Sequence, residues 1–392
     1  PYRRQRQMCI RDRNKILFDL TATQPAHGVK RHGGGKYGEI ILRRILERRL
    51  PVACYYDGNR WINPLIKDAV GDELYDINSA QLSEILHETG SMLIYSPLPN
   101  MPLFKFDECK IIGTIHGLRR LETPADPYCF LYKNLSWKDL GIFFYKYLVP
   151  LTFKKQLCKY YLQEWNNSKF SFITVSNHTA CAIKAYFPSF KDRKVPVFYS
   201  PSTSSDKELS LKYTDKYFLL VSGNRFEKNN LRAIKALDML FQGGYLKGYK
   251  VRIAGAKSSK IFRYKIKCKE NFEFFDYLED ADLEQLYHDA YCLIYPSLNE
   301  GFGYPPLEAM HYGVPVLASA FASITEICEG ASIYFNPFSI EEIAARILYI
   351  CNMDVHREYA KRGVNQFNKV ATKQKVDLDA LIDYLYKEAE TD

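Results

Sequence analysis

The residues whose chemistry is easiest to interpret lie in Ile294–Ser319, with the sequence IYPSLNEGFGYPPLEAMHYGVPVLAS. A strand is expected to end before the Gly-containing loop, and Pro305 and Pro306 should open the helix that follows, because proline is tolerated in a first turn. Glu300 on the loop and Glu308 in the first helical turn are eight residues apart, so both carboxylates can border one site. A carboxylate accepts two hydroxyl hydrogen bonds at once, which suits the vicinal diol of a ribose or another sugar.

Two glycines of this loop, Gly301 and Gly303, would let the backbone come close to a ligand phosphate. Free amide donors at the start of the helix also favour an anion. The alternative interpretation is that Glu308 only complements the helix dipole and that Glu300 is solvated.

At this point the sequence resembles the retaining glycosyltransferases of family 4, the group 1 glycosyltransferases of GT-B fold. Their hallmark is a pair of Glu residues separated by seven positions in an EGFG-P-EAM context, which Glu300 and Glu308 match. The following PV-AS and ITEI, around Pro315 and Glu326, match as well. The resemblance covers nearly all of residues 221–347 and, more loosely, the first half of the chain.

The resemblance implies roles for these residues. Glu308 would hold the ribose of a nucleotide, and Glu300 would be a catalytic residue beside the donor sugar. The amides of Gly301, Phe302 and Gly303 would lie near the sugar and the diphosphate.

A second element, VSGNRFEKNNLRAI, combines an expected strand end with a basic loop and a helix start. Arg225 and Lys228 could neutralise a diphosphate, whose charge grows as it departs; the alternative is two solvated surface cations. Similar family members carry an Arg and a Lys here that bind the donor diphosphate, but Gly223, Arg225 and Lys228 are more closely spaced than is usual. The prediction therefore concerns the cluster more than either residue.

The first half of the chain contains HGGGKYGEI, in which Gly33, Gly35 and Gly38 satisfy the GxGxxG pattern and Asp57 follows at an expected strand end. A dinucleotide site needs these glycines directly after the first strand. Twelve residues intervene here, so NAD binding is not expected.

Family members carry a Gly-rich loop at this place that approaches the donor diphosphate or the acceptor. The resemblance thus implies Gly34 and Gly35 for the donor diphosphate and Lys36 for the acceptor side. His116, after an expected strand, would be catalytic beside the donor sugar, and Arg119 would meet a phosphate on the acceptor side. A structural histidine, a plain helix-start cation and a solvated turn remain the alternatives for His116, Lys36 and Arg119.

Asp280 and Asp282 form a DxD pattern, which binds a metal in another large class of transferases. An amphipathic helix follows directly, so one of them is better interpreted as its N-cap. We expect no metal and no cofactor.

The composition limits the class of protein. With 392 residues, 47% hydrophobic and 25% charged, the chain should form two globular domains rather than a disordered region or a coiled coil. The net charge is +9, and the first 13 residues hold five Arg and one Asp. The mildly basic remainder suits anionic small molecules or an anionic membrane and does not indicate nucleic acid. Ten Cys without a CxxC pair indicate a reducing cytosol.

Strand-like runs alternate with helical patterns in both halves, which predicts an α/β fold with parallel sheets. With the resemblance, this indicates a GT-B protein, two doubly wound Rossmann-like domains facing a central cleft. The expected parts are an unstructured leader or artefact (1–14), an acceptor-binding domain (15–200), a nucleotide-sugar-binding domain (201–375) and a C-terminal helix (376–392) that could pack back on the first domain.

One further segment, residues 138–165, interleaves aromatic residues with Lys146, Lys154, Lys155 and Lys159. That composition fits a helix lying on an anionic membrane surface. A buried helix pair that lines the acceptor cleft fits it too, since Tyr and Phe are abundant across the whole chain.

The expected function is that of a retaining hexosyltransferase, which moves a sugar from a nucleotide-diphosphate donor to a saccharide or lipid-linked acceptor without a metal. Its expected setting is polysaccharide biosynthesis in the cytoplasm, with peripheral contact to the inner face of the membrane left open. The alternatives are a non-enzymatic nucleotide-sugar sensor and a sugar phosphorylase or epimerase of the same architecture.

Overall fold

The computed structural model describes residues 15–25, 33–133, 136–202 and 216–391. The predicted leader, and most of the polar stretch that follows the expected domain boundary at residue 200, lie outside these residues. The chain divides into two compact units, each described here by itself. The first comprises the described residues within Pro1–Gly117, Leu157–Thr203 and Thr372–Asp392, and the second those within Leu118–Gln156 and Ser204–Ala371.

The described residues of each unit form one sheet of six strands, all parallel. The strands of the first sheet are β1 (Ile16–Asp19), β2 (Val52–Tyr56), β3 (Leu74–Asp76), β4 (Leu93–Ser96), β5 (Lys110–Ile115) and β6 (Phe170–Thr174). Those of the second are β7 (Tyr217–Leu220), β8 (Lys250–Ala254), β9 (Phe272–Phe275), β10 (Cys292–Tyr295), β11 (Val316–Ser319) and β12 (Ser332–Phe335).

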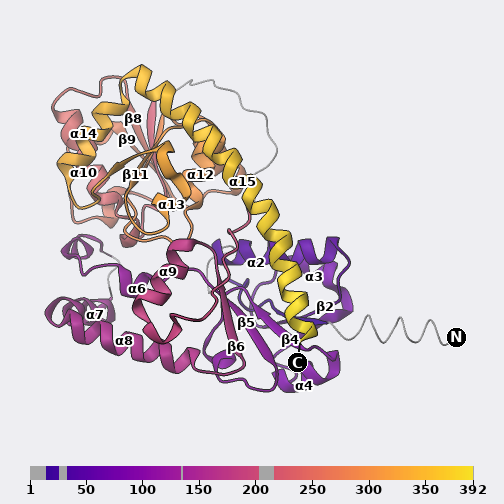
Figure 1. The fold of residues 1–392 in the computed structure, drawn as a ribbon. Helices are drawn as coiled ribbons and strands as arrows, with labels where there is room; N and C mark the ends of the chain where they lie inside the picture. The colour runs from indigo at the N-terminus through magenta and orange to yellow at the C-terminus, as the bar shows by residue number, and fades with distance from the viewer. Residues whose placement is uncertain (1–14, 26–32, 134–135, 203–215, 392) are drawn as a thin grey trace. The chain divides into compact units, whose positions relative to one another are not determined.

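Helices connect and cover the strands (Figure 1). They are α2 (Gly33–Glu47), α3 (Pro64–Val70), α4 (Leu82–Thr89), α5 (Met101–Phe104), α6 (Arg119–Glu122), α7 (Trp137–Leu148), α8 (Pro150–Trp165), α9 (Asn177–Tyr186), α10 (Asn230–Gln242), α11 (Asp280–His288), α12 (Tyr304–His311), α13 (Ile324–Cys328), α14 (Ile340–Ile350) and α15 (Met353–Glu390). Short 3-10 helices are η1 (Gly71–Glu73), η2 (Pro127–Leu131), η3 (Pro188–Phe190), η4 (Phe226–Lys228), η5 (Ser259–Ile261), η6 (Lys269–Asn271) and η7 (Glu329–Ala331).

The strand order confirms the predicted doubly wound α/β class. The first sheet runs β3-β2-β1-β4-β5-β6, and the second runs β12-β11-β10-β7-β8-β9, which is the same arrangement in its own numbering. The order reverses between β1 and β4 in one sheet and between β7 and β10 in the other. Ligands of such sheets bind at the carboxyl ends of the strands beside this switch point.

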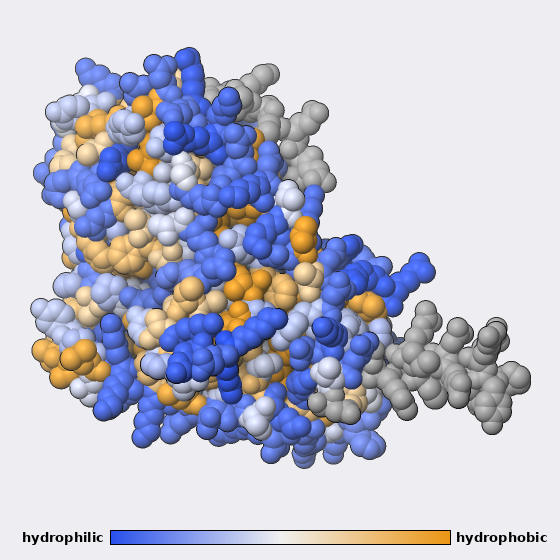
Figure 2. All heavy atoms as spheres, in the orientation of Figure 1, coloured by the Kyte–Doolittle hydropathy of each residue, from blue (hydrophilic) through white to orange (hydrophobic). Residues whose placement is uncertain are grey.

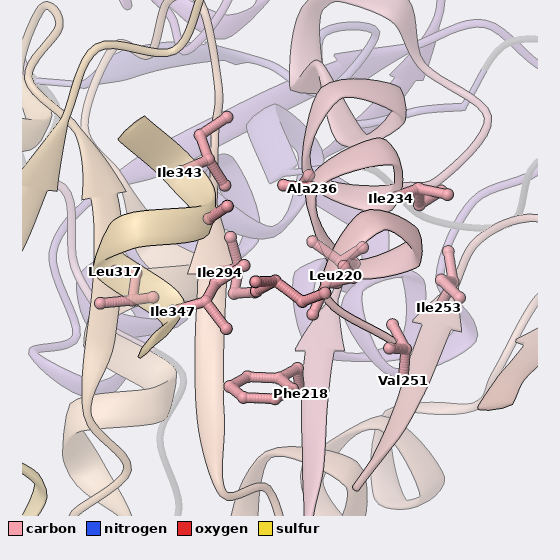
Figure 3. Close-up of a cluster of buried hydrophobic side chains, with 14 of the residues drawn as sticks. Phe218, Leu220, Ile234, Ala236, Val251, Ile253, Ile294, Leu317, Ile343 and Ile347 are labelled. Atoms are coloured by element: carbon pink, nitrogen blue, oxygen red, sulfur yellow. The ribbon is translucent and has the colours of Figure 1, made fainter. Parts of the chain in front are cut away.

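The core of the second unit forms between its sheet and the helices α10 and α14. Ile294 and Leu317 on neighbouring strands point toward Ile343 and Ile347 of α14, as Figure 3 shows. All four side chains are fully buried. Such strands, covered on both faces, carry nearly continuous apolar sequence, which is why the sequence located them well.

Residues 138–165, expected as a surface helix or a buried helix pair, form two helices. The break between α7 and α8 lies at Pro150, because proline lacks the N–H that a helix interior needs. No residue of α7 is buried. Beyond the strands named above, Val197 makes one isolated β-bridge with Thr174.

Residues 118–156 were expected in the first domain, but they belong to the second unit. Asp126, next to η2, makes a bidentate ion pair with Arg232 of α10, at 2.6 and 2.8 Å. Tyr132 lies in the core of the second unit. The backbone N–H of Lys133 also donates to the Ile261 carbonyl oxygen, at 2.8 Å. These contacts join a segment from the middle of the chain to the second sheet.

The expected separate helix 376–392 is, as far as residue 390, the last part of α15, a continuous helix of 38 residues. Its residues from 372 onward belong to the first unit. There Arg44 of α2 donates to Asp379 at 2.8 and 3.0 Å, and the Tyr386 hydroxyl donates to the Pro51 carbonyl at 2.9 Å.

Ile347→Ala should lower the free energy of unfolding of the second unit by about 2–5 kcal/mol, because it leaves a cavity in the core. Leu348→Ala removes the neighbouring side chain, which is 38% exposed, and should cost about 0.5 kcal/mol or less. Guanidinium denaturation of the two variants measures the difference. Equal costs would contradict the packing in Figure 3.

Candidate functional site

The loops that follow β7 and β10 are bound to one another at the switch point of the second sheet. The Leu298 N–H donates to the Glu227 carbonyl at 2.8 Å. The Asn229 side-chain amide donates to the Pro296 carbonyl at 3.1 Å. The basic loop and the Gly-containing loop that the sequence singled out therefore form one structure.

A buried ion pair lies where these loops meet. The Lys228 Nζ donates to Glu300 Oε1 at 2.6 Å, and the exposed fractions of the two side chains are 9% and 10%. The same Nζ donates to the Tyr295 hydroxyl at 2.8 Å. The Ser297 hydroxyl donates to Glu300 Oε1 at 2.5 Å. Lys228, predicted to bind a diphosphate, and Glu300, predicted to be catalytic, are thus direct hydrogen-bond partners.

The electrostatics keep Glu300 ionised. Burial disfavours its carboxylate, but the Lys228 charge and the hydrogen bonds from Lys228, Ser297 and Tyr295 outweigh burial, so the pKa of Glu300 lies below its usual value. Burial, together with the Glu300 charge, raises the pKa of Tyr295 well above its usual value. The phenol therefore stays neutral beside an ionised pair.

The backbone around Glu300 is fixed by neighbouring side chains. The Ser323 hydroxyl lies 2.9 Å from the carbonyl oxygens of both Glu300 and Phe302. The Asn299 side-chain amide donates to Glu122 of α6 at 2.8 Å. Phe302 itself is buried, 4% exposed, so the loop cannot shift without losing these contacts.

Helix α12 begins at Tyr304, one residue before the two prolines that were expected to open it. Gly303 precedes it with φ +115°, a conformation that strongly favours glycine. Pro305 therefore occupies the first turn and, like Pro306, supplies no N–H, so this helix start offers fewer amide donors than predicted. The amides of the loop itself carry more of any anion binding.

The sequence predicted Glu308 in the first turn of α12. Because the helix starts at Tyr304, Glu308 lies beyond that turn. Its side chain is half-buried. Burial and the neighbouring Glu308 carboxylate raise the pKa of Tyr287 well above its usual value. Glu308 thus lies beside a buried phenol of α11 rather than only complementing a dipole.

The other predicted cations of the second unit differ in setting. Arg225 is exposed and immediately precedes η4, which ends at Lys228. Arg119 is the first residue of α6. Its Nε is buried and has no hydrogen-bond partner among the described residues.

The predicted site residues of the first unit gather near its own switch point. His116 follows β5, and its Nε2 lies 2.9 Å from the Pro97 carbonyl oxygen, after β4. Because a carbonyl only accepts, Nε2 carries the proton. The Tyr37 ring meets the imidazole edge to face at 4.8 Å. This orients the imidazole of His116 firmly.

Gly34, Gly35 and Lys36 were expected on a loop but belong to the first turn of α2, which starts at Gly33. They therefore lie at the N-terminus of a helix, where the helix dipole favours an anion. Gly38 has a packing role, since a Cβ there would approach the side chains of Thr23 and Pro97 to 2.7 and 2.9 Å.

No group of three or more His, Cys, Asp or Glu side chains among the described residues could hold a metal ion. Asp280 and Asp282 lie in the first turn of α11. The N-cap of α11 is Glu279 rather than either of these Asp residues, so the predicted cap is wrong.

Sequence reasoning missed the side chains that hold the site together. Asn229 adopts a left-handed conformation with φ +55°, and its Oδ1 accepts from Arg232 at 2.8 Å. Arg232 is in turn held by Asp126. The NN pair at the start of α10 was a usable signal, because Asn tolerates this conformation. No local pattern connects Asp126 to Arg232.

Residues 202–367 match the family described as glycosyl transferases group 1. They form a group 1 glycosyltransferase domain. The family resemblance that Glu300 and Glu308 carried is confirmed, and this glycosyltransferase domain contains the Lys228–Glu300 pair.

Parts of the chain are also similar in sequence to curated glycosyltransferases. O-antigen chain mannosyltransferase B of Escherichia coli is 42% identical over 94 residues, 24% of this chain and 25% of the relative. O-antigen chain mannosyltransferase RfbU of Salmonella typhimurium is 26% identical over 235 residues, 60% of this chain and 63% of the relative. The matched segments thus span less than two thirds of these relatives.

Solved structures show the fold. A sucrose-phosphate synthase from Thermosynechococcus elongatus matches with a TM-score of 0.63 and 16% identity, over 96% of this chain and 100% of that one. The chain therefore has the two-domain GT-B fold that was predicted.

Lys228→Met should lower the free energy of unfolding by about 3–5 kcal/mol at pH 7, because it leaves the Glu300 carboxylate buried without a cation. The pKa of Glu300 in the folded protein lies below its ordinary 4.5. The contribution of the pair is thus present above pH 4.5 and is lost as the pH falls through the folded-state pKa. Denaturation at a series of pH values should show the parent and variant converging on acidification.

Lys369→Met is the matched control, since Lys369 pairs with Glu329 on the surface, where the side chains are 65% and 48% exposed. It should cost less than about 1 kcal/mol. A difference between parent and Lys228→Met that does not change with pH would contradict the buried pair.

Proposed function

We propose that the protein is a retaining glycosyltransferase that moves a hexose from a nucleoside-diphosphate sugar to a saccharide acceptor. The observation that carries this proposal is the buried Lys228–Glu300 pair at the switch point of a group 1 glycosyltransferase domain. An ionised pair held beside a Gly-containing loop offers preorganised charge for a polar, anionic ligand.

The donor would bind along the two joined loops of the second unit. Arg225, exposed at the edge of η4, and Lys228 would stabilise the departing diphosphate together with the amides of Gly301 and Gly303. Glu308 would accept the hydrogen bonds of the ribose diol. The contact of Lys228 with Glu300 supports these roles. Lys228 would bind a charged oxygen of the diphosphate while the adjacent Glu300 accepts from a hydroxyl of the attached sugar.

Glu300 would position the sugar rather than attack it. Its Oε1 already accepts from Lys228 and Ser297, and its lowered pKa makes the carboxylate a weak base. This favours a front-face substitution in which the leaving phosphate takes the acceptor proton. No metal or cofactor is part of this proposal, and His116 would contact the donor sugar.

The relatives described above are mannosyltransferases by name, so we propose mannose as the transferred sugar. The acceptor would be a saccharide, free or linked to a lipid, bound with help from Lys36 and Arg119. The Nε of Arg119, buried and without a hydrogen-bond partner in the described parts of the chain, supports an anionic group there. A cytoplasmic setting with peripheral contact to the inner face of an anionic membrane completes the proposal.

Glu308→Ala should abolish nucleotide binding by the glycosyltransferase domain. A ligand at 100 times its dissociation constant adds about 2.7 kcal/mol of stability, so one of UDP, GDP, ADP and dTDP should raise the melting temperature of the parent and not that of the variant. Glu341→Ala, at the exposed start of α14, is the control and should respond like the parent.

The alternatives predict other results. A sensor would bind the nucleoside diphosphate but release no free nucleotide from a mannose donor mixed with acceptor. A phosphorylase would need phosphate, and an epimerase would change the donor without acceptor. Failure of all four nucleotides to stabilise the parent would overturn the donor site.

A further inference from the structure

The helices α7 and α8 expose large apolar side chains. No residue of α7 is buried, and Trp165 is the buried residue of α8. The exposed fractions are 89% for Trp137, 70% for Leu148 and 82% for Leu151. Figure 2 shows hydrophobic side chains at the surface in the lower left, where Figure 1 has α7. Contiguous exposed apolar surface usually marks a binding surface.

Three large exposed side chains of α7 lie on one side of the helix. Trp137, Phe144 and Leu148 follow the spacing i, i+7 and i+11, which is one stripe of an α-helix. Leu151 continues the apolar sequence just after the break at Pro150. The α7–α8 face is defined here by Trp137, Phe144, Leu148 and Leu151.

Ring contacts with η2 hold α7 in place. The Phe143 ring meets the Phe130 ring of η2 edge to face at 4.6 Å, and the half-exposed Phe144 ring lies 5.9 Å from the same ring. Asp126, which precedes η2, is fixed by its ion pair with Arg232. The α7–α8 face therefore belongs to a helix that is anchored to the second unit.

The two helices carry an excess of cations. Residues 137–165, which α7 and α8 span, contain five Lys, one Asp and one Glu, and Asp139 accepts from Ser136 at 2.6 Å. Within the described part of the chain, no ion pair involves Lys138, Lys154 or Lys155. Asp139 offsets part of the charge of Lys138, but the excess of Lys makes this surface basic as well as apolar.

Lys146 adds a partly buried cation beneath the face. Its Nζ donates to the carbonyls of Arg120, at 3.1 Å, and of Thr123. Burial and repulsion from Lys154 lower the pKa of Lys146 to about 8. A nearby anion would favour its charged form.

We propose that the α7–α8 face docks on an anionic lipid bilayer. Trp at the level of the headgroups, aliphatic side chains below it and Lys on the flanks are the composition of an interfacial amphipathic helix. Each Lys near an anionic leaflet adds attraction. This inference rests on the proposed function in one respect: it assigns the membrane contact of that function to a particular surface.

A second copy of the chain fits this face less well. A symmetric dimer sets the same patch against itself, so the lysines of one copy would meet those of the other. Such like-charge contacts cost binding energy. A bilayer of anionic lipids meets the same lysines with opposite charge.

The test is co-sedimentation of the full chain with vesicles, without donor or acceptor. We expect binding to equal parts of phosphatidylcholine and phosphatidylglycerol, and none to phosphatidylcholine alone. Lys154→Glu with Lys155→Glu should lower the vesicle affinity at least about tenfold. Leu148→Ser with Leu151→Ser should lower it as well, through the lost apolar contact.

The control is Lys361→Glu with Lys375→Glu, the same change of charge at exposed positions of α15, which should bind vesicles like the parent. Melting curves of all variants verify folding. Absence of parent binding, equal binding to neutral vesicles, or unchanged binding by both α7–α8 variants overturns the proposal. The proposal is also overturned if the parent is a dimer and the Leu148→Ser with Leu151→Ser variant is a monomer that binds vesicles like the parent. Nucleotide binding is measured separately, so failure here and failure of the donor site are distinguishable.

Discussion

The ion pair between Lys228 and Glu300 governs the arrangement of the second unit's functional loops. Removing both charges from water is expensive, and only close contact with further hydrogen bonds compensates for it. Ser297 and Tyr295 supply those bonds from the end of β10. Because neither charge can be left alone in the interior, the loops after β7 and β10 must stay together.

The backbone around the pair is held by an outer layer of contacts. Asn229 keeps a left-handed conformation while its side chain bridges two carbonyls, those of Pro296 and Pro337. Arg232 binds both Asn229 and Asp126. Binding sites of this kind lose less conformational freedom when a ligand arrives, which is the advantage of preorganisation. A segment from the middle of the chain, residues 118–133, therefore contributes to a site formed by loops far along the sequence.

Local signals predicted much of the fold and the loops of the candidate site. The apolar runs of buried parallel strands and the breaks at Gly and Pro located most elements, and the spacing of Glu300 and Glu308 identified the domain. The predictions were wrong where a single backbone angle or a contact between distant residues determines the local structure. Glu308 lies outside the first turn of α12 because Gly303 lets the helix start early. Gly34 and Gly35 are helical although glycine favours loops, because α2 is held by its packing.

The sequence by itself determined the two doubly wound sheets, the order of their loops and the family of the second domain, since these follow from hydrophobic periodicity and short motifs. Tertiary structure alone decided that Lys228 pairs with Glu300, 72 positions away, and that Asp126 pairs with Arg232, 106 positions away. It also decided which side of α7 is exposed. The physical reason is that burial and ion pairing depend on what the folded chain brings together, and no local pattern of residue types carries that information.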